Sequence, residues 1–334
     1  MLKKFLKFLK IGLPIGLAIY LFYDTFQDPV TRAELVLSFQ NVNYFYILLM
    51  LGVVAISHMS RAYRWGFLME PLGYITKFKN AFYAVMIGYV VNMLIPRGGE
   101  ISRAVFFSRA EKVPIEKAFG TIAAERVFDL LALAIITTVT FYIERETALK
   151  YAMELYEKNK GSGEESFIHK PIVWIGILSI IVLAVLFFRN PKVKNKIENL
   201  SKGLWEGAMS IVKTKKKWAF LLHTLIIWFC YLLMFYIPFL SLDSTKDIGL
   251  NAIFVAFIFS AFSIVLTPGG TGAYHKAVGL AIGLFGYSAA TGEALGLIIW
   301  CAQAVFNIVV GLLSLYLINK QNENYLGNTT ADIG

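Results

Sequence analysis

The sequence predicts an all-α polytopic membrane protein, and three observations lead to this fold class. First, 57% of the 334 residues are hydrophobic and only 16% are charged, whereas soluble domains carry about 25% charged residues. Second, several apolar segments come close to or exceed the roughly 20 residues that a helix needs to cross a bilayer. Third, none of these segments shows the alternation of a barrel strand. Residues 1–334 are therefore predicted to form a single transmembrane domain.

The basic residues indicate how the chain is threaded through the membrane. The formal net charge is +10, but the cations fall in loops between apolar segments, which argues against a nucleic-acid partner. Lysines precede the first apolar segment, and a dense cationic set occupies residues 189–217. By the positive-inside rule, both regions lie in the cytoplasm. We therefore expect a multi-pass protein of the cytoplasmic (inner) membrane with both termini cytoplasmic.

Six apolar segments are expected to span the membrane. The first, 9–23, is predicted to be an uncleaved anchor helix, because no small-residue cleavage site follows it. A polar stretch through Gln40 and the acidic loop 144–170 are placed outside. The other expected spans are 44–62, 116–143, 171–188, 218–240 and 293–318, and 171–188 connects two halves of the chain, 44–143 and 218–318.

Two further apolar runs stop at glycine and proline. The run 80–95 ends at Pro96-Arg97-Gly98-Gly99-Glu100, and the run 249–266 ends at Thr267-Pro268-Gly269-Gly270-Thr271-Gly272. Complete crossings there would break the topology that the charges indicate, so we predict two re-entrant helical hairpins, 80–110 and 249–291. The hairpins are oppositely oriented and make the two halves an inverted repeat. Such a pattern indicates a transport site near the midplane of the membrane.

The first hairpin carries charged residues at helical spacing. Arg97, Glu100 and Arg103 are three residues apart and share one face if the segment is helical. Arginine suits phosphate oxygens, and Gly98 and Gly99 let backbone N–H groups approach the same anion, so these residues are candidates for binding a lipid headgroup. Alternatively, the charges pair with acidic residues of the following helix and hold the hairpin together.

The helix after the first hairpin carries Glu125, Arg126 and Asp129. Arg126 is a further candidate for headgroup binding. The two carboxylates share one helical face and suit a proton-coupled step. An internal salt bridge to the first hairpin is the alternative. Glu293 has a matching position near the start of the closing helix of the second half, and we group it with this proton or salt-bridge network.

The second hairpin offers backbone and polar groups. Gly269, Gly270 and Gly272 supply backbone flexibility, and His275 follows them as a group that titrates near neutral pH. These four are the remaining candidates for the headgroup site. The alternative for His275 is a hydrogen-bonded histidine in the protein interior, and Lys276 is a candidate for snorkelling to the interface.

No cofactor, metal site or catalytic residue is predicted. His58, His169 and His223 are scattered and share no metal-ligand spacing. The sequence has no P-loop, GxSxG, HExxH or paired CxxC pattern, which argues against ATP-driven pumping by this chain and against the usual hydrolase chemistries. We therefore expect that the protein is not an enzyme.

Three ordered motifs resemble a known family. They are Asn92 with Pro96-Arg97-Gly98-Gly99-Glu100 and Arg103, then Glu125-Arg126 with Asp129, then Pro268-Gly269-Gly270 with Gly272. Over roughly residues 10–320 they resemble the flippase-like family named for the transmembrane region of lysylphosphatidylglycerol synthase, in its stand-alone, UPF0104-type form. The resemblance implies a bundle with two re-entrant elements that translocates lipids. Aminoacylated phospholipids, hopanoids and polyprenyl-linked lipids are the substrates it suggests.

The sequence departs from the family in two places. Bifunctional members carry a cytoplasmic aminoacyl-transferase domain, and this sequence has none after Lys320, so synthase activity is not expected. Many members have Glu three residues after the last glycine of the second hairpin, where this chain has His275. The role of that position is therefore expected to be altered or pH-dependent.

The leading hypothesis is a flippase that moves an anionic or phosphate-containing lipid without ATP hydrolysis. The headgroup phosphate would lie near Arg97, Arg103 and Arg126, between the two hairpins. One alternative is a membrane enzyme that acts on a lipid-linked sugar with Glu125 and Asp129 as acid or base. Another is a non-transporting envelope scaffold. Membrane lipids are the expected partners, and a second copy of the chain and envelope-biosynthesis proteins are further candidates.

Overall fold

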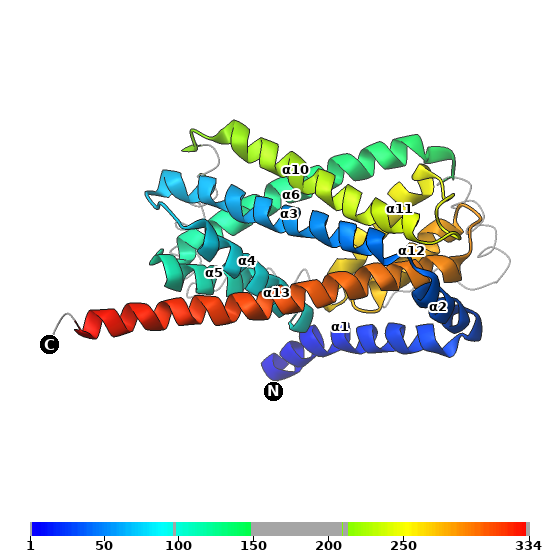
Figure 1. The fold of residues 1–334 in the computed structure, drawn as a ribbon, viewed down its shortest axis with the longest axis horizontal. Coiled ribbons are helices and arrows are strands. Elements are labelled where there is room, and N and C mark those ends of the chain that lie inside the picture. Colours follow the sequence, from blue (N-terminus) through cyan, green and yellow to red (C-terminus); the bar gives the residue numbers. More distant parts are fainter. Residues whose placement is uncertain (1, 96–97, 148–208, 210–212, 332–334) are drawn as a thin grey trace.

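In a computed structural model of the chain, the described residues are 2–95, 98–147, 209 and 213–331 (Figure 1). Every regular element within these ranges is helical, which confirms the predicted all-α fold class. Pro96, Arg97 and the predicted connecting helix 171–188 lie outside the described residues. The elements are α1 (Leu2–Gln27), α2 (Pro29–Asn41), α3 (Tyr44–Met69), η1 (Glu70–Leu72), α4 (Phe78–Leu94), α5 (Gly98–Glu111), α6 (Ile115–Ile143), α10 (Lys217–Tyr236), η3 (Ile237–Ser241), α11 (Leu250–Leu266), η4 (Pro268–Gly270), α12 (Ala273–Gly283) and α13 (Ala289–Ala331).

Four helical segments of the described chain are long and apolar enough to cross a membrane. They are Tyr44–Leu72, Ile115–Ile143, Lys217–Ser241 and Ala289–Gln321. They correspond to the predicted spans that begin at residues 44, 116, 218 and 293. α3 and α13 run opposite to α6 and α10 along the long axis of the molecule (Figure 1), as the charge-based topology requires. The predicted anchor helix 9–23 forms the middle of the longer helix α1.

The polar stretch before residue 41 forms a helix, α2, which the sequence analysis did not predict. Pro29 supplies a fixed backbone angle at its first turn, and the carboxylate of Asp28 accepts hydrogen bonds at the N-terminus of the helix. The hydroxyl of Thr31 donates to this carboxylate and lowers the pKa of Asp28 from its ordinary value of 3.8. Leu35 on α2 packs against Ala294 and Leu297 of α13. α2 therefore covers the beginning of α13.

The first pair of short helices, α4 and α5, is antiparallel. At its open end, Asn80 Nδ2 donates to Glu111 Oε1 at 2.7 Å. At its closed end, the backbone N–H of Gly99 donates to Asn92 Oδ1 at 2.7 Å. Gly99 also packs so closely against Gly88 that a Cβ at residue 99 would overlap the Gly88 backbone oxygen. The helices thus break where the glycines were expected to break them.

The second pair, α11 and α12, has the same construction. At its open end, the backbone N–H of Gly249 donates to the hydroxyl of Tyr287 at 3.1 Å. The two pairs lie toward opposite ends of the long axis (Figure 1), and their closed ends meet, since a Cβ on Gly269 would lie 3.3 Å from Cγ of Met93. α12 already ends at Gly283, earlier than the predicted limit at residue 291. The re-entrant position of both pairs and the inverted repeat stay predictions.

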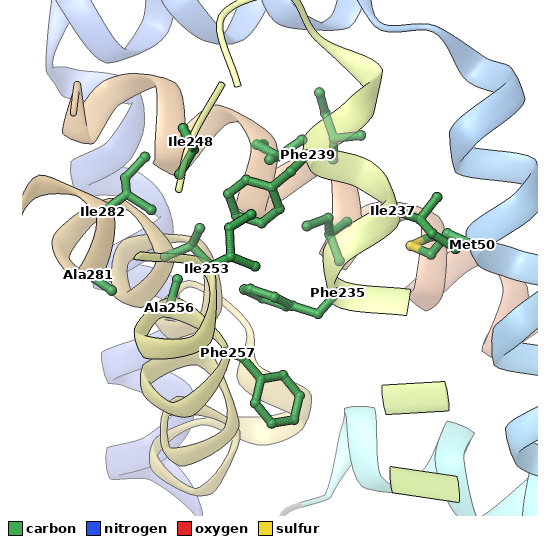
Figure 2. Close-up of a cluster of buried hydrophobic side chains, with 14 of the residues drawn as sticks. Met50, Phe235, Ile237, Phe239, Ile248, Ile253, Ala256, Phe257, Ala281 and Ile282 are labelled. Carbon is green, nitrogen blue, oxygen red and sulfur yellow. The ribbon is translucent and has the colours of Figure 1, made fainter. Parts of the chain in front are cut away.

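Each pair has its own apolar core. The larger core joins α3, α10, η3, α11 and α12, and Figure 2 shows aromatic rings at its centre. The ring centroid of Phe235 lies 5.6 Å from those of Phe239 and Phe257. The second core joins α3 to α4, α5 and α6, and the rings of Trp65 and Phe107 are 4.0 Å apart at their centroids. These contacts fix both pairs against the longer helices.

Candidate functional site

Helices α3, α5 and α6 bring charged side chains into one network. Its members are Arg61, Arg64, Arg103 and Arg126 with Glu100, Glu125 and Asp129. Four arginines against three carboxylates leave one positive charge in excess among these described residues. A charge excess inside a membrane bundle is expensive unless it serves an ion or a ligand, so this network is the candidate functional site.

The inner part of the network joins α3 and α5 to α6. Arg103 Nη1 lies 2.7 Å from Glu125 Oε2, and its guanidinium carbon lies 3.9 Å from the ring centre of Trp65. Arg64 Nη2 lies 3.0 Å from Asp129 Oδ1. These four charged side chains are buried. Removing Glu125 would take away the carboxylate that pairs with the buried Arg103, so this part holds the helices in register.

The outer part of the network faces open space. Arg61 Nη1 lies 3.1 Å from Asp129 Oδ2, and its Nη2 donates to the hydroxyl of Tyr231 at 2.7 Å. Arg126 Nη2 lies 3.0 Å from Glu100 Oε1 and its Nη1 lies 3.6 Å from Asp129 Oδ2. The Arg126 side chain is 44% exposed, whereas that of Arg61 is 3% exposed. Arg126 is thus the most accessible arginine of the network.

The burial of Arg61 and Arg64 corrects a sequence-based prediction. The predicted span ended at residue 62, so that Arg61 and Arg64 would mark its cytoplasmic end. α3 instead continues to Met69, and both side chains turn into the bundle. A signal for this was present, because His58, Arg61 and Arg64 recur every three residues and therefore share one face of a helix.

A cavity of about 310 Å³ adjoins the outer part of the network. Arg61, Arg126 and Asp129 make it charged at one end. Its apolar walls come from α6, α10 and α11, namely Leu130, Leu133, Met234, Phe235, Phe257, Ala261 and Ile264. Neutral polar groups, which include those of His58, Trp228, Gln303 and Asn307, also line it. The cavity is therefore amphipathic, and its volume falls at the small end of ligand sites in proteins.

This cavity reaches the side of the described bundle between α6 and α11. Leu130 of α6 and Ile264 of α11 both line the cavity, and both side chains are also exposed on the outer surface. α6 is the least buried of the four candidate spans. An acyl chain could therefore lie along these residues while its headgroup contacts Arg61 and Arg126.

A second, smaller cavity adjoins the same arginines. Its volume is about 20 Å³, enough for one water molecule. It shares Arg61, Tyr89 and Arg126 with the larger cavity. The predicted site residues Gly99, Glu100 and Arg103 line it. Residues of the first motif thus share this small cavity with Arg61 and Arg126.

The predicted glycines of the second hairpin lie at a tight turn in the described structure. Gly269, Gly270 and Gly272 have φ angles of 58°, 76° and 75°, a region that favours glycine. A Cβ on Gly272 would lie 2.6 Å from the carbonyl oxygen of Ala18, so α1 packs directly against this turn. None of the three glycines lines the large cavity. They shape the turn and its contact with α1.

The polar residues after this turn form a second charged cluster. Lys276 Nζ lies 2.9 Å from Glu293 Oε2 and 3.1 Å from Asp24 Oδ2. His275 Nε2 lies 2.7 Å from the hydroxyl of Thr25. Glu293 therefore pairs with Lys276, away from the partners of Glu125 and Asp129, and His275 has the buried, hydrogen-bonded position that the sequence analysis gave as the alternative.

Comparison with known proteins agrees with this architecture. Residues 9–311 match the family described as the lysylphosphatidylglycerol synthase transmembrane region. The chain is 22% identical to a UPF0104 membrane protein of Methanocaldococcus jannaschii, over 86% of this chain and 89% of that protein. It is 24% identical to a UPF0104 membrane protein of Pyrococcus horikoshii, over 72% and 78% of the two chains. No solved structure matches. Since the match covers nearly the whole chain, the protein belongs to the family of the lysylphosphatidylglycerol synthase transmembrane region.

Proposed function

We propose that the protein moves an anionic or phosphate-containing lipid across the cytoplasmic membrane without hydrolysing ATP. Phospholipids, aminoacyl-phospholipids and polyprenyl-linked lipids are the substrate classes considered. The observation that carries the proposal is the amphipathic cavity, in which two arginines are combined with apolar walls from three helices. A lipid has the same division between a charged headgroup and apolar chains.

The charges of the site support an anionic headgroup. Arg61 and Arg126 present guanidinium groups to the cavity, and the network to which they belong has four arginines but only three carboxylates. Guanidinium groups bind phosphate oxygens with paired hydrogen bonds. The described site therefore has one positive charge that a headgroup with a single negative charge would balance.

The opening between α6 and α11 supports lateral entry. A lipid that leaves its chains in the bilayer avoids about 0.8 kcal/mol for each CH₂ group that water would otherwise contact. The exposed side chains of Leu130 and Ile264 supply an apolar edge along which the chains could remain in the membrane. Only the headgroup then needs the cavity.

The arrangement of Glu125 and Asp129 favours transport over group transfer. Glu125 lies 2.7 Å from Arg103 and 3.9 Å from Arg64, and Asp129 lies within 3.6 Å of three arginines. A general acid or base must exchange a proton with its substrate. Carboxylates that arginines hold on several sides are better suited to binding charge.

A leaflet-exchange assay tests the proposal. The purified protein is reconstituted in liposomes that contain fluorescent phosphatidylglycerol or a fluorescent polyprenyl phosphate, and the fraction of probe that a membrane-impermeant quencher reaches is followed over time. We expect protein-dependent exchange, reduced at least tenfold in Arg126→Ala because the most accessible guanidinium of the cavity is lost. Arg109→Ala is the control, since Arg109 is exposed on α5 and lines neither of the two cavities around Arg126.

The other outcomes separate the alternatives. Chemical conversion of a lipid-linked sugar without exchange would favour the membrane enzyme. No exchange and no conversion across a broad lipid panel would favour the scaffold. Equal loss of exchange in Arg126→Ala and Arg109→Ala would contradict the role given to the cavity.

A further inference from the structure

The ion pair between Glu100 and Arg126 differs from the rest of the network in its exposure. The Arg126 side chain is 44% exposed and that of Glu100 is 25% exposed, whereas the members of the inner pairs are nearly inaccessible. An accessible ion pair contributes little to stability. Arg103 and Glu125 already join α5 to α6 through a buried pair of opposite polarity. The outer pair is therefore not needed to hold the two helices together.

The carboxylate of Glu100 also has incomplete hydrogen bonding in the described structure. Its Oε1 contacts Arg126, but its Oε2 is buried and has no hydrogen-bond partner among the described residues. A buried carboxylate oxygen without a partner is costly, and that cost lowers the free energy needed to move the side chain away. The ion pair between Glu100 and Arg126 can thus give way to a pair between Arg126 and another anion.

Arg126 stands at the boundary between the two cavities. It lines both, together with Arg61 and Tyr89, whereas Glu100 lines only the smaller one. Glu100 therefore contacts the guanidinium of Arg126 from within the smaller cavity and not from the amphipathic one. An anion that enters the large cavity meets an arginine already occupied by a carboxylate of the protein.

We propose that Glu100 is an internal substitute for the substrate's phosphate, which holds Arg126 in the empty protein and is displaced when an anionic headgroup binds. This inference rests on the proposed function. It makes Glu100 a specificity-determining residue, because only a ligand with negative charge can replace it. Glu100 then lowers the apparent affinity for every anion, because an anion binds only the fraction of the protein in which Glu100 has left Arg126.

Displacement has a structural consequence for the first hairpin. Glu100 lies in the first turn of α5, directly after the break between α4 and α5. Arg126 would retain Asp129, 3.6 Å from its Nη1, and Arg103 would retain Glu125. Only the first turn of α5 loses its link to α6. Headgroup binding is thereby coupled to the freedom of the first turn of α5.

Equilibrium binding to the full chain in detergent tests the inference. The probes are dihexanoyl-phosphatidylglycerol, dihexanoyl-phosphatidylcholine and inorganic phosphate, each titrated by calorimetry. We expect Glu100→Gln to bind the phosphatidylglycerol on the order of tenfold more tightly than the parent protein, since one competing negative charge is removed. Binding of the zwitterionic phosphatidylcholine should stay within twofold. Glu116→Gln is the matched control, because it removes one carboxylate from an exposed position on α6.

Glu100→Ala provides a second variant, and melting temperature with elution volume reports whether each variant is folded. Unchanged or weaker phosphatidylglycerol binding in folded variants overturns the inference, as does an equal gain for phosphatidylcholine. If both variants unfold, the pair is structural and the inference is wrong. Tighter binding of inorganic phosphate without any lipid binding would keep the role of Glu100 but contradict lipid transport. If no probe binds any form, both proposals fail.

Discussion

The guanidinium group of Arg103 contacts both the Glu125 carboxylate and the indole ring of Trp65. Its planar group pairs with the acid through one N–H and covers the ring with its face, which lysine cannot do. Both of these partners come from other helices, so the sequence alone left two roles open for this arginine. The inner position of Arg103 suits support of the site, whereas the exposure of Arg126 suits the contact with an anion that we propose.

We predict that Arg103→Met destabilises the protein by about 3–5 kcal/mol, because Glu125 would remain buried without its closest cation. The double variant Arg103→Met/Glu125→Leu should recover most of this loss, since it removes both charges. Chemical denaturation in detergent measures both effects, with Arg109→Met as the exposed control. A double variant no more stable than the single one would contradict the pairing.

The contacts of the charged residues could be predicted from the sequence only in part. Glu125 and Asp129 were predicted to lie in a salt bridge or a proton site from their shared helical face, and they do contact arginines. The partners were harder to predict, because Arg61 and Arg64 look like the cytoplasmic end of a helix when only local sequence is read. The contact of Lys276 with Asp24 joins residues far apart in the chain, and no local pattern contains it.

At the scale of helices, the two breaks were predictable and their packing was not. Glycine and proline mark where α4 ends and where η4 forms, because these residues interrupt helices wherever they occur together. The close approach of Gly99 to Gly88 depends on the angle between α4 and α5. That angle follows from the second core, which Trp65 and Phe107 complete from different helices.

Substitution of a single glycine tests this packing. Gly99→Ala should destabilise the protein by about 1–3 kcal/mol, because the added Cβ would overlap the Gly88 backbone and the Asn92 side chain. Gly52→Ala is the matched control in α3, where nothing lies within 4 Å of a new Cβ. It should leave stability unchanged or raise it by about 0.5–1 kcal/mol. Melting temperatures in detergent compare the two, and equal effects would refute the close contact.

At the scale of the whole molecule, the opposed helix pairs predict which loops face opposite sides of the membrane. Ile75 lies before α4 at the open end of the first pair and is 96% exposed. Asp243 lies before α11 at the open end of the second pair and its side chain is also exposed. If both pairs are re-entrant, these two positions lie on opposite sides.

Cysteine labelling measures this arrangement. Ile75→Cys should react with a membrane-impermeant maleimide only after the cytoplasmic side is opened, whereas Asp243→Cys should react in intact cells. The background replaces Cys230 and Cys301 with alanine, and that cysteine-free protein is the control. Labelling of both positions from one side would contradict the inverted arrangement and the predicted topology.

In the proposed transport, the three carboxylates among the four arginines also affect how long the headgroup stays bound. An anion within hydrocarbon meets a high energy barrier, and a fixed positive charge turns the top of that barrier into a trap. A pathway works only when the trap is deep enough to admit the ion and shallow enough to release it. Four uncompensated guanidinium groups would hold a phosphate too long. In the transport that we propose, Glu100, Glu125 and Asp129 would shorten the residence time of the headgroup, and turnover would depend on the acids as much as on the arginines.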